Sequence, residues 1–238
     1  QNCQTIPTAG HPVVYGDWLH AGADKPTILV YAHYDVQPVD PVELWDTPPF
    51  EPTERDGKIF ARGVIDDKCG VWCNLKALES IMSTKEGQLP VNIKLFFEGE
   101  EEMGSPNMLP FVQENKELLA ADLLVICDGP FNPKQPSIAY ALRGICSAEV
   151  TITGPDHDLH SGAYGGAVYN PIHMVGKIIG SFHDDNGRIT IPGFYHGVQV
   201  LDAAEKENME KYWAVIGDNV KAKAGTDKFW GESIAPMP

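Results

Sequence analysis

The fold is set by the stretch Thr27-Ile-Leu-Val-Tyr-Ala-His-Tyr-Asp35. It opens as a short apolar, β-rich run behind Lys25-Pro26, which is typical of a buried strand. Two later runs have the same character, Val91-Asn-Ile-Lys-Leu-Phe-Phe97 and Asp122-Leu-Leu-Val-Ile-Cys127. The three runs predict three strands that belong to one sheet.

Helical patterns separate these strands. Apolar residues recur at near-helical spacing between Gly70 and Ser83, and a second helical stretch runs from Met108 to Ala120. Because strands alternate with helices, we expect an α/β fold with a mainly parallel sheet and helices on both faces. A hairpin is expected across Arg55-Asp-Gly-Lys58, between the first strand and the first helix.

The pattern changes near Gly144. Residues 145–153 alternate as a strand does, 171–182 and 202–222 are helical in character, and 188–191 are short and β-like. We therefore expect two domains, residues 1–144 and residues 145–238, of which the second is of the α+β type.

Composition excludes several classes of function. The 33 acidic and 18 basic residues give a net charge of −15, which repels phosphate backbones and anionic lipid, so we expect neither a nucleic-acid nor a membrane partner. No apolar run approaches the ~20 residues of a membrane span. The odd number of cysteines, five, predicts no disulfide framework. With no signal peptide visible, a reducing cytoplasmic location is expected.

Potential metal ligands follow each predicted strand. The positions are His33 and Asp35 after the first, Glu100, Glu101 and Glu102 after the second, Asp128 after the third, and Asp66-Asp67 before the first helix. The carboxyl ends of parallel strands meet at one edge of a sheet, so these side chains should converge. Adjacent glutamates repel one another unless a cation or proton offsets their charge. The convergence predicts a metal site.

Each segment also has a simpler interpretation. A histidine after a strand is often a core or turn residue, and Asp66-Asp67 could cap a helix. The glutamates could form a solvated loop, and Asp128-Gly-Pro130 could be a turn. A metal accounts for all four segments at once, so it is the interpretation that we prefer.

The ligand types indicate the class of metal. One imidazole with several carboxylates, and no thiolate, suits Zn²⁺, Co²⁺ or Mn²⁺ in a hydrolytic site. There are more carboxylates than one tetrahedral ion needs, which favours a pair of ions that share a bridging carboxylate. Asp35 can accept a hydrogen bond from the second ring nitrogen of His33. One glutamate can stay off the metals and act as general base.

Four motifs, in their order along the chain, resemble those of the M20 metallopeptidases. They are His33-Tyr-Asp-Val-Gln-Pro38, Ala61-Arg-Gly-Val-Ile-Asp-Asp-Lys68, Glu98-Gly-Glu-Glu-Glu-Met-Gly-Ser105 and Asp158-Leu-His-Ser-Gly162. Within the family, the chain is most similar to the dipeptidase branch that includes cytosolic nonspecific dipeptidase and carnosinase. The resemblance implies a zinc-peptidase-like catalytic domain in residues 1–144. It also implies the start of an inserted, ferredoxin-like lid and dimerisation domain in residues 145–238.

The resemblance implies two Zn²⁺ ions per subunit, or Mn²⁺ or Co²⁺ in their place. His33 and Asp128 would bind one ion, Asp66 would bridge both, and Glu102 would bind the other. Glu101 would be the general base on the metal-bridging water, and Asp35 would orient His33. The family's Asp66–Asp67 peptide is typically cis. Cys69 stands where these enzymes usually have glycine.

The resemblance further implies a homodimer formed through the lid domain. The histidine matching His160 reaches the active site of the other subunit in dimeric members and helps to stabilise the oxyanion. From the residues alone, His160 would be a loop histidine that caps the following turn. The family's second zinc also takes a distal histidine, whose context none of His173, His183 and His196 has. We therefore expect the chain to be about half of a longer enzyme, inactive by itself if the missing ligand is essential.

The expected function is dinuclear zinc-dependent hydrolysis of dipeptides or short peptides. One alternative is another M20 amidohydrolase, an N-acyl amino acid deacylase or a carboxypeptidase, with the same chemistry and a different pocket. The other is an inactive metal-binding or dimerisation fragment. The sequence has no GxSxG elbow, HExxH, P-loop or GxGxxG motif, so these motif-based activities are not expected.

Overall fold

The computed structural model of the chain describes residues 2–129, 138–139 and 144–231. It divides into two compact units, Gln1–Tyr140 and Ala141–Pro238. The identification of the second unit as the beginning of a lid domain stays a prediction. Each unit is described by itself.

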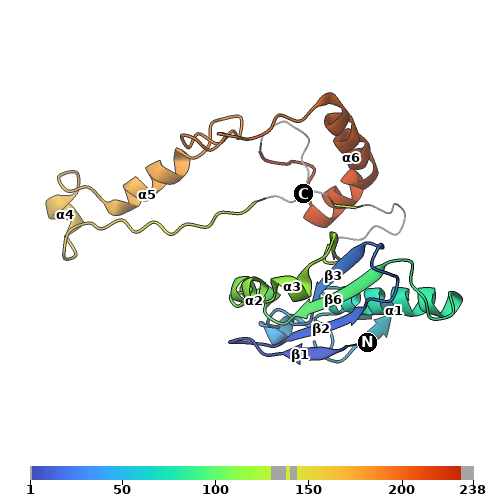
Figure 1. Cartoon of the computed structure of the whole chain (residues 1–238). Helices are drawn as coiled ribbons and strands as arrows, with labels where there is room; N and C mark the ends of the chain where they lie inside the picture. The colour runs from blue at the N-terminus through green and yellow to red at the C-terminus, as the bar shows by residue number, and fades with distance from the viewer. Residues whose placement is uncertain (1, 130–137, 140–143, 232–238) are drawn as a thin grey trace. The chain divides into compact units, whose positions relative to one another are not determined.

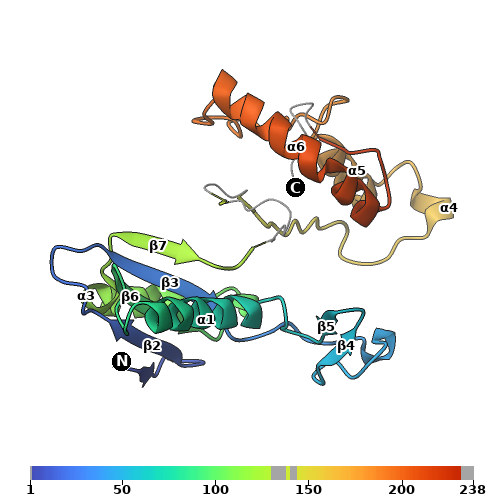
Figure 2. The same cartoon turned by 90° about the vertical axis from the view of Figure 1, so that its right-hand side faces the viewer.

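The first unit is built on a five-stranded sheet with the order β1-β2-β6-β3-β7 (Figure 1; β7 is labelled in Figure 2). The strands are β1 (Gln4–Ile6), β2 (Val13–Trp18), β3 (Thr27–His33), β6 (Asn92–Glu98) and β7 (Leu123–Ile126). β3 runs parallel to both β6 and β7, which confirms the three strands expected from sequence. β2 is antiparallel to β6, and β1 to β2, so the sheet is mixed at one edge, where sequence reasoning had placed no strands.

Helices cover both faces of this sheet, as expected. α1 (Lys68–Thr84) packs through Leu78 and Met82 against a core cluster that contains Val30 and Ile93. On the opposite face, α2 (Met108–Glu114) and α3 (Lys116–Leu119) contribute Phe111 and Leu119 to a second core cluster. Its other buried members come from the strands and are Val13, Tyr15, Leu29 and Phe96. Figure 2 shows α1 lying along the near face of the sheet.

The single helix expected over 108–120 is two short helices that meet at Asn115. The Asn115 side chain donates to the Phe111 carbonyl at 2.9 Å, which is a local bond that competes with helix continuation. The buried Lys94 ammonium donates to the carbonyls of Leu118 and Ala120 at 2.6 and 2.7 Å. These bonds give hydrogen-bond partners to carbonyl groups at the C-terminal end of α3. Burial lowers the pKa of Lys94, against the opposing charge of Asp17.

The expected hairpin is present as β4 (Thr53–Arg55) and β5 (Lys58–Phe60). Its two loop residues, Asp56 and Gly57, both have positive φ, 51° and 69°, as a type I′ turn requires. The described residues of this unit also form two 3₁₀ turns, Val42–Leu44 and Glu101–Met103. The second of these follows β6 directly and carries two of the candidate site residues.

The second unit contains α4 (Ser161–Tyr164), α5 (Pro171–Gly180) and α6 (Ala203–Ala224). The two helices predicted there are confirmed as α5 and α6. The strand expected over 145–153 is wrong: 144–153 form no strand, because no strand lies in the described residues 144–231 to pair with it. Of the short β-like run, Ile189 makes an isolated bridge to His183. No described helix is long and apolar enough to cross a membrane.

Candidate metal centre

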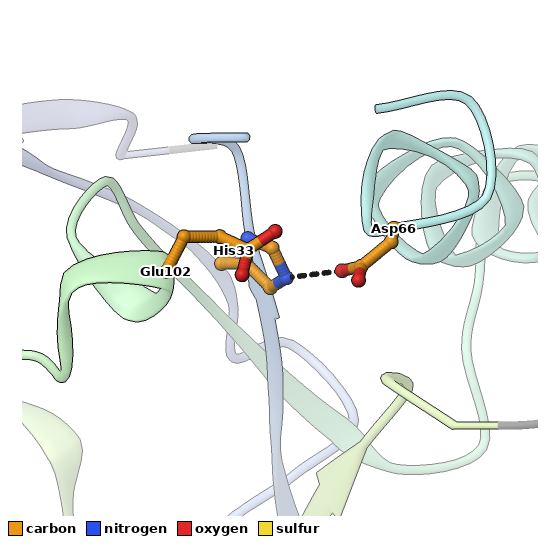
Figure 3. A group of neighbouring side chains, drawn as sticks. All are labelled: His33, Asp66 and Glu102. Atoms are coloured by element: carbon orange, nitrogen blue, oxygen red, sulfur yellow. Dashed lines mark hydrogen bonds and ion pairs between the residues drawn. The ribbon is translucent and has the colours of Figure 1, made fainter. Parts of the chain in front are cut away.

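His33 lies at the centre of the site. It is the last residue of β3, it pairs in register with Glu98 of β6, and its side chain is fully buried. Its Nε2 atom faces three carboxylates: Asp66 Oδ1 at 2.9 Å, Asp128 Oδ2 at 3.8 Å and Glu101 Oε2 at 3.9 Å. Figure 3 shows Asp66 and Glu102 reaching the imidazole from different segments of the chain. The sheet edge thus gathers the predicted ligands.

Asp66 and Asp67 are adjacent, but their carboxylates make different contacts. Their peptide bond is cis, as the resemblance implied. Asp67 is buried and caps α1: its Oδ1 accepts from the Gly70 amide at 3.0 Å, and its Oδ2 accepts from the His33 amide at 3.2 Å. The capping interpretation therefore holds for Asp67. Asp66, whose side chain is 58% exposed, is left to face the imidazole.

Only a glycine fits at position 70, in the first turn of α1. A Cβ atom at Gly70 would lie 2.3 Å from both Asp67 Oδ1 and the carbonyl oxygen of Cys127. Because Cys127 is followed directly by Asp128, this contact brings the start of α1 against the end of β7. Close packing here places Asp66 and Asp128 on the same site.

Asp35 holds both the imidazole and the turn that follows β6. Its Oδ1 lies 3.2 Å from His33 Nδ1 and accepts from the Glu101 amide at 3.2 Å, while its Oδ2 accepts from the Glu102 amide at 3.0 Å. With the Nδ1 proton held by Asp35, Nε2 is the ring nitrogen that can bind a metal ion. Sequence reasoning assigned the contact with His33, and it missed the two backbone contacts.

Gln37 is a site residue that the sequence analysis did not assign. Its side-chain amide donates to Glu102 Oε2 at 2.7 Å and to the Glu102 carbonyl at 3.2 Å. One sequence signal was available: in extended chain, alternate residues point to the same side, and Gln37 follows His33 and Asp35 at that spacing. The amide fixes one oxygen of a candidate ligand.

Two other glutamates, Glu98 at the end of β6 and Glu100 just after it, point elsewhere. Glu98 is buried and accepts from the hydroxyls of Tyr31 and Ser105, the latter at 3.1 Å. Glu100 is buried and accepts from the Asn107 amide at 2.8 Å. This arrangement supports the choice of Glu101 and Glu102 as the glutamates that serve the site.

The electrostatics of the site are unbalanced. Burial lowers the pKa of His33, but the hydrogen bond to Asp66 and the charges of Asp128, Glu101 and Asp35 outweigh it and raise the pKa. Burial raises the pKa of Glu101 and of Asp128; in each case His33 opposes the shift, and neighbouring carboxylates add to it. A single protonated imidazole does not neutralise the carboxylates of Asp35, Asp66, Glu101 and Asp128 around it. A bound divalent cation would.

The residues fit a divalent metal ion. Two groups have ligand atoms that all lie within 4.8 Å of one another, His33–Asp66–Glu102 and His33–Glu101–Asp128. Imidazole with carboxylate oxygens is a donor set that suits Zn²⁺ or Mn²⁺. The described part of the first unit thus brings together every metal ligand and the base expected there. Each of the two glutamates belongs to one group, so the division of roles between them is part of the proposal below.

His160 lies in the second unit, apart from this cluster in the sequence. It is exposed and caps α4, with its Nδ1 accepting from the Gly162 amide at 3.0 Å. This is the turn-capping role that the residues alone indicated. Its reach to another subunit stays a prediction.

Known proteins resemble the chain over most of its length, including both the metal site and the segment around His160. Residues 29–223 match the family described as peptidase family M20/M25/M40. A mouse Beta-Ala-His dipeptidase is 35% identical over 206 residues, covering 85% of this chain. A Cys-Gly metallodipeptidase of Schizosaccharomyces pombe is 36% identical over 198 residues, covering 82%. The chain spans 41% of the length of each of these two relatives.

A solved structure shows the same fold. The M20 family metallo-carboxypeptidase Sso-CP2 from Sulfolobus solfataricus superposes with a TM-score of 0.74 at 32% identity. The match covers 98% of this chain and 52% of the other. With the family match extending over most of its residues, the chain belongs to the peptidase family M20/M25/M40.

Proposed function

We propose that the chain carries much of the active site of a zinc-dependent dipeptidase, which hydrolyses the peptide bond of dipeptides or short peptides. The observation that supports this most is the buried His33 imidazole, with Nε2 facing three carboxylates at 2.9 to 3.9 Å. The relatives named as Beta-Ala-His dipeptidase and Cys-Gly metallodipeptidase support dipeptides as the substrate class.

The proposed centre holds two Zn²⁺ ions, or Mn²⁺ or Co²⁺. His33 and Asp128 would hold one ion, and Glu102 would hold the other. Asp66, the carboxylate nearest to His33 Nε2, would contact both. Bound divalent ions polarise a scissile carbonyl and lower the pKa of a water molecule.

Glu101 is the proposed general base. Its carboxylate faces the site, and its backbone amide is held by Asp35, so the side chain starts from a fixed position. It would take a proton from the attacking water and deliver it to the leaving amine. Asp35 keeps His33 oriented, and Gln37 fixes one oxygen of Glu102.

The proposal includes a homodimer in which His160 serves the active site of the other subunit. An imidazole N–H directed at the oxyanion would stabilise the tetrahedral intermediate. Its exposure in the second unit is compatible with such a contact. Mixing His160→Ala subunits with Glu101→Gln subunits tests it, because one site of a mixed dimer retains both groups. Recovery of activity supports the role, and no recovery in proven mixed dimers rejects it.

A second candidate is a carboxypeptidase or an N-acyl amino acid deacylase. The TM-score of 0.74 to a metallo-carboxypeptidase favours keeping it. The chemistry would be the same, since in each case the metal ligands and the base would act at the scissile amide, and the substrates differ elsewhere. A panel of dipeptides, longer peptides and N-acetyl amino acids separates the two.

The decisive experiment is Glu101→Gln in the longest form of the protein that the cell makes. Glutamine keeps the shape and cannot accept the proton, so dipeptide turnover should fall by ~10²–10⁴-fold with metal content unchanged. Glu114→Gln, an exposed position of α2, is the matched control and should retain full activity. Loss of metal together with activity would make Glu101 a ligand. Full activity would reject the base.

A further inference from the structure

Two cysteines of α1 form a pair that the proposed chemistry does not use. Cys69 and Cys73 are four residues apart on one helical face, and their sulfur atoms lie 3.7 Å apart. Cys73 is exposed and Cys69 partly exposed, so a small solute reaches both. Neither belongs to the imidazole–carboxylate groups found among the described residues.

The distance between the sulfurs matches a bridging ion better than a direct bond. For tetrahedral zinc, with bonds to sulfur of ~2.3 Å, two thiolates stand ~3.8 Å apart, and a larger soft ion needs a somewhat wider span. The 3.7 Å between the two sulfur atoms needs only a small side-chain adjustment to reach such a span. A disulfide needs the two Cβ atoms ~3.5–4.5 Å apart. In a helix, the Cβ atoms of residues i and i+4 are ~5–6 Å apart. Helix α1 therefore favours chelation over oxidation to a disulfide.

The protons on the pair are displaceable. Burial and the neighbouring Cys73 thiol raise the pKa of Cys69, so the Cys69 sulfur holds its proton when no cation is present. Binding a cation releases these protons, and a soft cation forms bonds to sulfur strong enough to drive the release. Cys127 differs, because its thiol donates to Asn74 Oδ1 at 3.3 Å within the packing of α1 on the sheet.

We propose that Cys69 and Cys73 form a dithiol site that binds one soft, thiophilic centre, such as Cd²⁺, Cu⁺ or trivalent arsenic, through both sulfurs. The site begins two residues after Asp67, the cap that holds the His33 amide. It is distinct in its donor atoms from the proposed zinc centre. The proposal stands whether or not the chain is a peptidase.

Phenylarsine oxide tests the site directly. Its arsenic forms two As–S bonds with a thiol pair, both S–H bonds and the As–O bond break, and one water leaves; no oxidation occurs. We expect one arsenical per chain by intact mass, with Cys69 and Cys73 protected from iodoacetamide in the zinc-loaded protein. Cd²⁺ titration should give thiolate-to-cadmium charge-transfer absorption with the same stoichiometry.

Variants of each cysteine complete the test. Cys69→Ser and Cys73→Ser should each weaken arsenical binding by on the order of 10²-fold or more, because one sulfur replaces a chelate. Cys146→Ser, at an exposed cysteine of the second unit, should bind as the parent does. Circular dichroism checks that the variants fold, and Cys73, being exposed, tolerates serine. Unchanged binding in either variant, or protection of other cysteines instead, would overturn the proposal.

Discussion

Replacing Asp35 with asparagine isolates what its second carboxylate oxygen does. Asp35 Oδ1 serves both His33 Nδ1 and the Glu101 amide, and Oδ2 serves the Glu102 amide. An asparagine that keeps its oxygen at Oδ1 would direct its own NH₂ group at the Glu102 amide. The flipped asparagine would satisfy Glu102 and lose the other two contacts. Neither orientation satisfies all three donors.

The magnitude follows from the contacts. The variant loses at least one hydrogen bond to a charged acceptor, and one such bond contributes ~1.5–3 kcal/mol. The Asp35 side chain is only 16% exposed, so water replaces the lost acceptor poorly. Outer partners of metal ligands typically contribute ~10–100-fold to metal affinity, which corresponds to ~1.4–2.7 kcal/mol. We expect Asp35→Asn to weaken Zn²⁺ binding within that range and Asp35→Ala to weaken it more.

Chelator competition measures the Zn²⁺ affinity, and Co²⁺ absorption reports ligand geometry. Asp24→Asn is the matched control, since the Asp24 side chain is 77% exposed and contacts Lys25 at 3.2 Å. The control should bind Zn²⁺ as the parent does. If Asp35→Asn binds Zn²⁺ with the parental affinity, Asp35 does not position the metal ligands.

Three further predictions concern the same unit. Gln37→Leu removes the hydrogen-bond donor to Glu102 and should weaken Zn²⁺ binding ~10-fold or more. The control Gln88→Leu, at an exposed position, should leave Zn²⁺ affinity unchanged. Equal Zn²⁺ affinities in the two variants would exclude a role for Gln37. Gly70→Ala should lower the free energy of unfolding by ~1–3 kcal/mol, because the new Cβ atom would clash with the Asp67 side chain and the Cys127 backbone. Urea unfolding measures the change. Gly176→Ala is the control and should cause no such loss, since a Cβ atom there would point into open space. In the metal-free protein the pKa values of His33, Glu101 and Asp128 are all raised, so the folded state binds more protons than the unfolded chain. Stability should therefore fall as pH rises from the ordinary carboxyl range, about 4, through and beyond the imidazole value, about 6.5; Zn²⁺ should offset the loss, and urea midpoints that rise over this range with EDTA present would contradict it.

Local pattern predicted most of the first unit. The three parallel strands were apparent because each is a compact apolar run bounded by polar residues, and the loop Asp56-Gly57 is a hairpin signal by itself. β1 and β2 were missed, since β1 has three residues and β2 is interrupted by Gly16 and Asp17. Their strand conformation depends on pairing with β6, a non-local contact.

The sequence predicted which residues form the site better than it predicted the hydrogen bonds between them. Strand-end positions identified His33 and Asp128, but hydrogen bonds to backbone amides leave no trace in residue types. The contacts of Asp35 with the amides of Glu101 and Glu102 are of this kind. In the second unit, helix α6 was predicted from its own pattern, whereas the strand over 145–153 required a pairing partner that the described residues lack.

The most direct test of the metal centre is an anomalous difference map, recorded at the zinc edge from crystals of the Zn²⁺-loaded protein. We expect density at ~2.0–2.2 Å from His33 Nε2 and from oxygens of Asp66 and Asp128, with a second peak beside Glu102. Clear zinc density elsewhere in the molecule, with none between these side chains, would contradict this expectation.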